Sequence, residues 1–332
     1  MDTRVKPVKV VFVDLDNTLY DWLGFFGPAF RGLCTRLSEL SGQPMKQLYE
    51  EFKCVFAKHG SVEYSFALQE LPSLRNLHPS WRSVDLVNHY FEAIQVYQSR
   101  RRRYLRVYHD VSKTVQELQS FGLIVVAISD SHRFQVLNRL RQLHLLELLD
   151  GVCCIEDHVG PSEDELDSIR KFEPSRYQLS SKREFLLPHG LRKPSPGVLH
   201  WLLQQLQLNH EEALYVGDSL IKDIAMAREA GIYDCWAAYG NIYSPLDMST
   251  LVQVTHWPAK TVEKVLNAKP DELGIQPSCV IHSFMEVLAV AMKTPLERRR
   301  YKFEQPHFSQ DFDFELSPEG VTDGGNNYGA QN

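Results

Sequence analysis

The sequence predicts an α/β fold: a parallel β-sheet covered by helices, with a second, helical domain inserted after the first strand. Short apolar runs recur along the chain, and each has the length and composition of a parallel strand buried on both faces. Segments with helical spacing lie between several of these runs, which is typical of strand–helix–strand units with right-handed crossovers. Residues 20–104 interrupt the alternation, because they combine helical spacing and many aromatic side chains with almost no strand signal.

Each expected element has a local signal. The strands are apolar runs at residues 8–13, 123–128, 151–155, 213–216, 234–238 and 279–281. The helices between them have leucine-rich or amphipathic spacing and cover residues 111–121, 135–149, 196–208 and 222–230. Gly122 and Gly231 directly follow two of these helices, where glycine commonly adopts the left-handed conformation that ends a helix.

Composition and charge exclude several classes of protein. A chain of 332 residues corresponds to about two domains at roughly 150 residues each, and its 43% apolar and 23% charged residues are ordinary for a globular protein. The net charge of −6 gives no general reason to expect a nucleic-acid partner. No apolar run is long enough for a membrane-spanning helix or a signal peptide, so we expect no membrane partner. The six cysteines include no C-x-x-C pair, and we therefore expect reduced thiols in a cytoplasmic protein.

Polar side chains stand where several expected strands end. Asp14 and Asp16 follow the first strand, Ser129 follows the second, and Asp218 follows Gly217 after the fourth. Two acids beyond a buried strand are costly unless they bind a cation or react, and ligands of open α/β sheets bind at the carboxyl ends of the strands. Each motif taken alone also suits an ordinary turn or helix cap.

The set carries more information in its order. Along the chain it consists of Asp14-x-Asp16, Ser129, Lys193 in a Lys-Pro context, and Gly217-Asp218-Ser219 with Asp223 shortly after. This order resembles the four motifs of the haloacid dehalogenase superfamily of phosphohydrolases, over about residues 8–20 and 105–290. The helical segment after the first motif is similar to the type 1 cap of that superfamily.

The resemblance implies a Rossmann-like core and a cap. The core would consist of residues 1–19 and 105–295, and residues 20–104 would form the helical cap. Residues 156–192 are acidic at their start and longer than the usual connection, and we expect an exposed insertion loop there. Residues 296–332 end in a glycine- and asparagine-rich stretch, which predicts a disordered tail.

The resemblance also implies roles for the motif residues. Asp14 would be the nucleophile that forms an aspartyl-phosphate, and Asp16 would be the general acid and then the general base. Ser129 would hydrogen-bond a phosphoryl oxygen, and Lys193 would hold that group and neutralise the nucleophile. The implied cofactor is Mg²⁺, which prefers hard oxygen ligands. Its protein ligands would be the Asp14 carboxylate, the Asp16 backbone carbonyl and the Asp218 carboxylate, with Asp223 acting through water or orienting Lys193.

The implied activity is Mg²⁺-dependent hydrolysis of a small phosphorylated metabolite. Asp16 favours a phosphate ester over a haloacid, because dehalogenase-like members lack an acid two positions after the nucleophile. Sugar phosphates, phosphoglycolate and nucleoside monophosphates are all compatible substrates. The alternatives are a phosphosugar mutase and a catalytically weak binding or regulatory protein of the same fold. The sequence predicts no oligomeric state.

Some residues depart from the family pattern or allow two interpretations. Asp130 stands where the second motif usually has Asn, and Lys171 and Lys182 are rivals of Lys193 without its Lys-Pro context. Trp22 could line a substrate pocket or pack the hinge, and His132 could approach the substrate or lie on the surface. For the basic run of Arg100 to Arg103 with Arg106, a solvated helix end is favoured over substrate steering or nucleic-acid binding.

Overall fold

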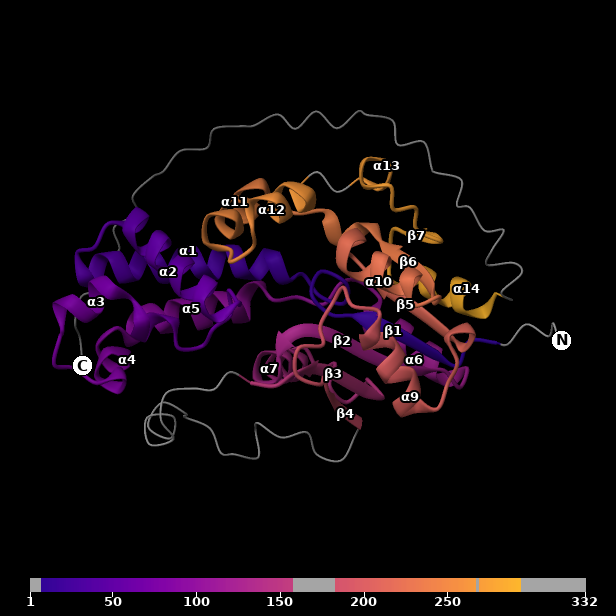
Figure 1. Ribbon diagram of the computed structural model, residues 1–332. Helices are drawn as coiled ribbons and strands as arrows, with labels where there is room; N and C mark the ends of the chain where they lie inside the picture. The colour runs from indigo at the N-terminus through magenta and orange to yellow at the C-terminus, as the bar shows by residue number, and fades with distance from the viewer. Residues whose placement is uncertain (1–6, 158–182, 267–268, 294–332) are drawn as a thin grey trace, which may run out of the picture. The chain divides into compact units, whose positions relative to one another are not determined.

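The predicted parallel α/β architecture is confirmed. Figure 1 shows the computed structural model, which describes residues 7–157, 183–266 and 269–293. Seven parallel strands form one sheet in the order β4-β3-β2-β1-β5-β6-β7. They are β1 (Val10–Asp14), β2 (Ile124–His132), β3 (Gly151–Ile155), β4 (Arg183–Leu186), β5 (Ala213–Gly217), β6 (Tyr233–Ala237) and β7 (Cys279–Ile281).

Strand β1 occupies the centre of the sheet. Its residues are buried on both faces, as expected for a continuous apolar run between two parallel neighbours. Val10 is in register with Ile124 of β2 on one side and with Ala213 of β5 on the other. This register brings the carboxyl ends of β1, β2 and β5 to the same edge of the sheet.

Helices pack on the sheet and bury its apolar side chains. Val10 and Phe12 of β1 belong to a buried cluster with Leu199 and Leu202 of α9 (Gly197–Leu206) and Met226 of α10 (Ala225–Glu229). In addition, α7 (Arg133–Gln142) packs on β2 and β3, while α6 (Val111–Ser120) packs on β2 and on α14 (Glu286–Met292). The core therefore lies between the sheet and these helices.

Five α-helices and one 3-10 turn lie between β1 and α6, and we call residues 22–104 the helical insertion. They are α1 (Trp22–Ser41), α2 (Met45–His59), η1 (Ala67–Glu70), α3 (Pro72–Leu77), α4 (Ser83–His89) and α5 (Phe91–Tyr104). The Asp21 side chain accepts a hydrogen bond from the Gly24 N–H and caps α1, which ends at left-handed Gly42. Phe30 of α1 contacts Phe52 of α2 edge-on, with 5.1 Å between the ring centroids.

A helix from the C-terminal half also contacts the helical insertion. Helix α11 (Pro245–Val254) packs against α1 and α2. Arg31 of α1 donates to Thr250 Oγ1 at 2.8 Å and forms an ion pair with Asp247 at 2.8 Å. The helices α12 (Ala259–Leu266) and α13 (Pro270–Leu273) follow α11. The insertion is therefore held by α11 as well as by its two chain connections.

Several predicted boundaries are wrong. β2 continues through Ser129 to His132, because its end pairs with β3 after an irregularity in the register. α7 ends at Gln142 rather than at residue 149. The chain turns shortly after Gln142, at His144, which is in the left-handed conformation. The expected helix 222–230 begins as a π-helical turn, Leu220–Ile224, and continues as α10 (Ala225–Glu229).

The expected loop 156–192 is wrong at its C-terminal part. Arg183–Leu186 forms β4, which extends the sheet beside β3. Residues 158–182, and the expected tail 296–332, lie outside the described residues.

All six cysteines are free, as the sequence predicts. Among the helices of the described ranges, none has both the length and the apolar composition needed to cross a bilayer.

Candidate active site

Five of the predicted site residues, Asp223 among them, come together at the carboxyl edge of the sheet. Asp14 ends β1, Ser129 lies in β2, and Asp218 directly follows β5. Asp223 lies in the π-helical turn after β5, and Lys193 comes from the loop before α9. Oxygen atoms of Asp14, Asp218 and Asp223 lie within 4.8 Å of one another. We call these three residues the acidic cluster.

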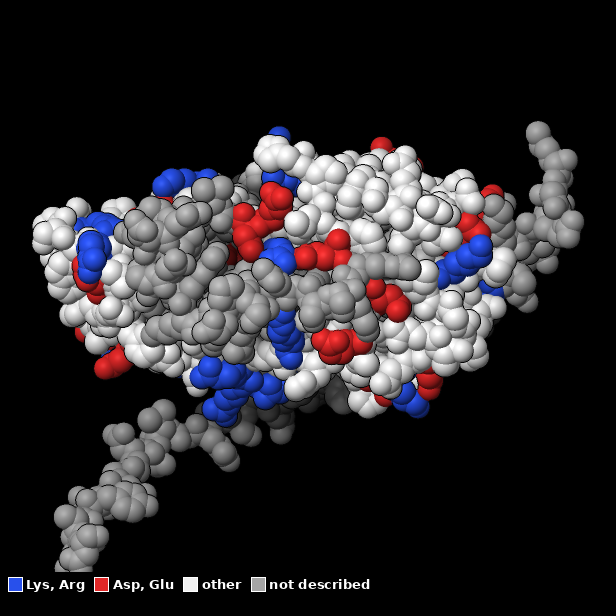
Figure 2. All heavy atoms as spheres, turned by 90° about the horizontal axis from the view of Figure 1, so that it is seen from below, with Lys and Arg blue, Asp and Glu red and all other residues white. Residues whose placement is uncertain are grey.

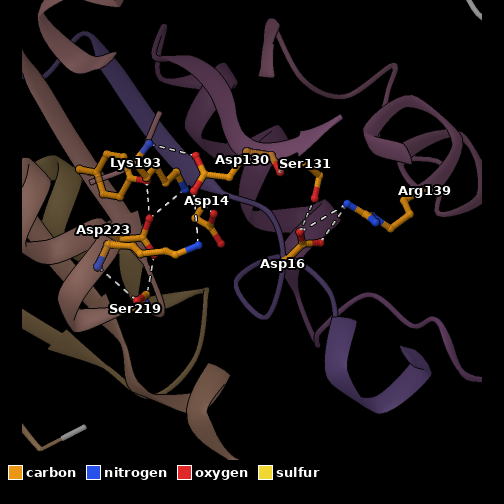
Figure 3. A network of polar contacts seen from close by, with 11 residues as sticks. Asp14, Asp16, Asp130, Ser131, Arg139, Lys193, Ser219 and Asp223 are labelled. Atoms are coloured by element: carbon orange, nitrogen blue, oxygen red, sulfur yellow. Dashed lines mark hydrogen bonds and ion pairs between the residues drawn. The ribbon is translucent and has the colours of Figure 1, made fainter. Parts of the chain in front are cut away.

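Lys193 is the cation of this site. Its Nζ donates to Asp14 Oδ1 at 2.5 Å and to Asp223 Oδ1 at 2.8 Å (Figure 3). Burial lowers the pKa of Lys193, but the carboxylates of Asp14 and Asp223 outweigh it and raise that pKa well above its ordinary value. Lys193 therefore carries its charge at neutral pH. Its rivals Lys171 and Lys182 lie outside the described residues.

Asp223 is held in place from three sides. The Tyr215 hydroxyl donates to Asp223 Oδ1 at 2.7 Å, and the Ser219 N–H donates to Asp223 Oδ2 at 3.0 Å. A Cβ atom at Gly217 would lie 2.5 Å from the Asp223 carboxyl carbon, so this position requires glycine for the close approach. With its contact to Lys193, Asp223 is placed to orient that lysine.

Ser129 and Asp130 have different partners. Ser129 is buried, and its Oγ accepts the Ser131 N–H at 3.0 Å. Asp130 Oδ1 accepts the Lys193 backbone N–H at 3.0 Å, and Oδ2 lies 3.4 Å from Lys222 Nζ. The acid that departs from the family pattern thus anchors the lysine loop, and a lysine offsets its charge.

The Asp16 carboxylate takes part in a separate network. Ser131 Oγ donates to Asp16 Oδ2 at 3.1 Å, and Arg139 Nη2 lies 3.3 Å from the same carboxylate. Arg139, which is 1% exposed, also donates to the Tyr20 hydroxyl at 2.9 Å and forms an ion pair with Glu63. Figure 3 shows the Asp16 carboxylate turned toward Arg139 and away from the acidic cluster. We call these five residues the Arg139 network.

The Arg139 network joins the helical insertion to the sheet. Glu63 lies between α2 and η1, whereas Arg139 lies in α7 and Ser131 at the end of β2. Glu63 Oε2 also lies 3.2 Å from Ser131 Oγ, in addition to its ion pair with Arg139. Arg139, Glu63 and Tyr20 were not predicted from the sequence. The available signal was a charged residue among the apolar positions of α7, between Val136 and Leu140.

The acids of the site outnumber its cations. Burial raises the pKa of Asp14 to about 7, although Lys193 opposes the shift. Burial, with Asp14 and Asp223 nearby, raises the pKa of Asp218 well above its ordinary value. Among the described cations, Lys193 is the one that contacts the acidic cluster, and a hard divalent cation would restore the ionised forms. The oxygen donors and the excess of negative charge therefore fit the expected Mg²⁺.

The Asp16 carboxylate is not part of the acidic cluster. The expected contact of the Asp16 backbone carbonyl with a metal ion stays a prediction. Burial raises the pKa of Asp16, although Arg139 opposes the shift. A carboxyl group with a raised pKa retains a proton more readily near neutral pH, which is what a general acid requires.

A cavity of about 370 Å³ lies at the helical insertion, with His132 and Gln135 of the sheet region in its wall. We call it the insertion cavity. Trp22 is not among its lining residues and instead stacks on Phe26, with 4.8 Å between the ring centroids. Trp22 therefore packs the start of α1, and His132 is the residue that reaches the cavity.

The basic run has a mixed environment. Arg101 lines the insertion cavity, whereas Arg102 and Arg103 are exposed near the end of α5. A solvated helix end thus describes only part of the run. On the face shown in Figure 2, Lys and Arg form small separate groups among acidic side chains over the described surface.

Comparisons with known proteins point to one family. Residues 8–231 match the haloacid dehalogenase-like hydrolases. The chain is 24% identical over 249 residues to glyceraldehyde 3-phosphate phosphatase of Pyrococcus furiosus, covering 74% of this chain and 86% of that protein. It is also 24% identical to phosphoglycolate phosphatase of Vibrio cholerae, covering 71% of this chain and 87% of that protein.

The structure resembles that of a 2-haloacid dehalogenase from Pseudomonas syringae. The TM-score is 0.50 at 18% sequence identity, and the match covers 85% of this chain and 97% of the other. At this level of identity the likeness concerns the fold alone.

Proposed function

Because the chain belongs to the haloacid dehalogenase-like hydrolases, we propose that it hydrolyses a small phosphomonoester through an aspartyl-phosphate on Asp14. The observation that carries the proposal is the position of Lys193, whose Nζ contacts both Asp14 and Asp223. A carboxylate nucleophile and a phosphate dianion repel each other, and a buried cation beside the nucleophile offsets this repulsion. The names of the two phosphatase relatives support a phosphate ester as the substrate.

Two steps would complete the reaction. An oxygen of Asp14 attacks phosphorus, the bond from phosphorus to the alcohol oxygen breaks, and Asp16 gives its proton to that oxygen. Asp16 then takes a proton from water, whose oxygen attacks the same phosphorus atom and releases Asp14 and inorganic phosphate. During both steps Lys193 holds the phosphoryl group and Ser129 donates its hydroxyl proton.

Mg²⁺ is part of this proposal. Asp14 and Asp218 would hold it with their carboxylates, together with the Asp16 backbone carbonyl, while Asp223 orients Lys193. When bound, the ion supplies positive charge that stabilises the phosphoryl oxygens and the ionised form of the nucleophile.

The helical insertion would act as the cap. Glu63 of the insertion contacts Ser131 and Arg139, which both contact Asp16. These contacts support an arrangement in which the insertion covers the leaving-group side of the site. They favour a small substrate over a phosphoprotein.

The test measures phosphate release from a panel of small phosphomonoesters, with and without Mg²⁺. We expect release that depends on Mg²⁺ and that is abolished in Asp14→Asn, since an amide cannot form the covalent intermediate. The matched control is Asp271→Asn, the same change at an exposed position of α13, which should leave the rate unchanged. A folded Asp14→Asn protein with activity near wild type would rule out the covalent mechanism.

A second variant tests the proton donor. Asp16→Asn should slow alkyl phosphates far more than p-nitrophenyl phosphate, because an alcohol of high pKa needs a proton to leave. Equal losses for both esters would contradict the role of Asp16. Tight phosphate binding without turnover would instead favour a binding protein, and phosphate recovered on a second sugar hydroxyl would favour a mutase.

A further inference from the structure

The insertion cavity has walls that are mainly apolar, with many aromatic side chains among polar ones. Phe26 and Phe30 of α1, Phe52 and Phe56 of α2, and Phe91 and Tyr97 of α5 contribute to its lining. The first four are core residues of the insertion, and none of them is more than 3% exposed. A volume of about 370 Å³ is within the usual size of small-molecule sites, which are largely apolar with a few placed polar groups.

One polar residue of the wall, Glu63, is linked to Asp16. Glu63, His132 and Gln135 line the cavity. Glu63 Oε2 is 3.2 Å from Ser131 Oγ, which is 3.1 Å from Asp16 Oδ2. A single hydroxyl group therefore connects a cavity-lining residue to the proposed proton donor. Asp14, Lys193 and the rest of the acidic cluster do not line the cavity.

We propose that the insertion cavity binds the alcohol part of the phosphomonoester, and that this part is bulky and apolar, such as an aryl or arylalkyl group. The inference rests on the proposed function and narrows its substrate class. The phosphoryl group would lie at Asp14 and Lys193, the ester oxygen near Asp16, and the apolar body among the aromatic side chains.

The apolar majority of the wall favours this class over sugar phosphates, although Gln69, Gln95 and Gln98 also line the cavity. Each sugar hydroxyl placed against phenylalanine rings would lose its hydrogen bonds to water without a replacement. An aromatic body in the same place gains burial and ring contacts. Three-carbon esters would leave most of the cavity unfilled.

Arg101 adds a polar requirement to the body of the substrate. Its side chain lines the cavity, and its Nε is buried without a hydrogen-bond partner among the described residues. A buried donor without an acceptor is unfavourable. An acceptor such as a carboxylate on the apolar body would satisfy it.

The first experiment compares kcat/KM for 2-phenylethyl phosphate, ethyl phosphate and glycerol 3-phosphate. All three have primary-alcohol leaving groups, so the comparison mainly concerns the body of the substrate. We expect 2-phenylethyl phosphate to be favoured by about 10- to 100-fold, the usual effect of burying one aromatic ring. Equal values for the three esters, or a preference for glycerol 3-phosphate, would overturn the inference.

Two variants locate the preference in the cavity. Ile94→Trp places a large ring at a lining position of α5 and should remove the preference while ethyl phosphate is still hydrolysed. The control is Leu77→Trp, an exposed position of the same insertion that does not line the cavity, which should keep it. Arg101→Met should abolish the expected advantage of 2-(4-carboxyphenyl)ethyl phosphate over 2-phenylethyl phosphate. If Ile94→Trp keeps the full preference, the cavity is not the binding site.

A binding measurement separates the inference from the proposed function. Calorimetric titration of the full chain with 2-phenylethylphosphonate and ethylphosphonate requires no turnover. If no ester is hydrolysed but the phenyl compound binds at least tenfold more tightly, the phosphatase proposal fails and the cavity assignment stands. If the esters are hydrolysed but the two phosphonates bind equally, the cavity assignment fails and the phosphatase proposal stands.

Discussion

Removal of the Arg139 guanidinium should destabilise the fold strongly. Arg139 is 1% exposed, lies 3.3 Å from the Asp16 carboxylate, forms an ion pair with Glu63, and donates to Tyr20 at 2.9 Å. Arg139→Met would leave the Asp16 and Glu63 carboxylates, in a mostly buried site, without the cation that contacts them both. Breaking a buried ion pair by removing one partner costs about 3–5 kcal/mol, and we expect a loss of free energy of unfolding in this range.

Urea denaturation at pH 7, followed by circular dichroism, measures this loss through the shift of the midpoint at constant slope. A double-mutant cycle with Glu63→Gln gives the pairwise part. The double variant should lose less than the sum of the two single variants, by about 1–3 kcal/mol, because the neutral amide introduced by Glu63→Gln no longer needs the cation.

The control is Arg36→Met, which removes exposed ion pairs to Glu39 and Glu92 and should leave the midpoint unchanged. A loss below about 1 kcal/mol for Arg139→Met would refute the reasoning that the network holds the insertion to the sheet, since this is within the range of ordinary surface changes. Strict additivity in the cycle would show that Glu63 and Arg139 are not coupled.

Three further predictions concern single side chains. Asp130→Ala should lower kcat by roughly tenfold or more, because the backbone N–H of Lys193 loses its acceptor. Asp130→Asn keeps an acceptor oxygen and should keep most of the rate. Equal losses of kcat for the two variants in steady-state assays would contradict this prediction. Gly217→Ala should lower the free energy of unfolding by about 1–3 kcal/mol and displace Asp223, since the new Cβ would lie 2.5 Å from the Asp223 carboxyl carbon. An unchanged thermal midpoint together with an unchanged kcat would disprove the contact. Burial lowers the pKa of His256 to about 4 from 6.5, so below pH 6.5 the unfolded chain binds a proton that the folded chain does not, and stability falls as the pH drops toward 4. His256→Gln should reduce the difference between urea midpoints at pH 7 and pH 5, and an unchanged difference would exclude this histidine as the cause.

The acidic cluster could be predicted because its residues follow buried strands. An apolar run that stops at an acid, as Val10 to Val13 does at Asp14, is a local signal that needs no tertiary information. The carboxyl ends of neighbouring parallel strands then bring such residues together. Lys193 could be predicted only from the order of the motifs, because a Lys-Pro dipeptide by itself is equally common in loops that have no catalytic role.

The Arg139 network could not be predicted by the same means. Its ion pair joins residues 63 and 139, which are 76 positions apart, and neither lies at a strand end. In the sequence, Arg139 looks like a solvated arginine of a basic helix. Only the packing of α7 on β2 and β3 shows that it is buried. Strand β4 could not be predicted for a related reason. Its four residues at the edge of the sheet form a strand because they pair with β3, and they contain no apolar run.

The central position of β1 has a consequence for synthesis of the chain. β1 is the first strand to be made, yet one of its edges pairs with β5, which ends at Gly217, about 200 residues later. At about 5–20 residues per second, that edge waits roughly 10–40 s on the ribosome. Throughout this interval a strand of VVFV exposes unpaired backbone groups that can pair with another nascent chain. Slow translation of the helical insertion would lengthen the interval, and a chaperone that binds short apolar strands would protect the chain during it.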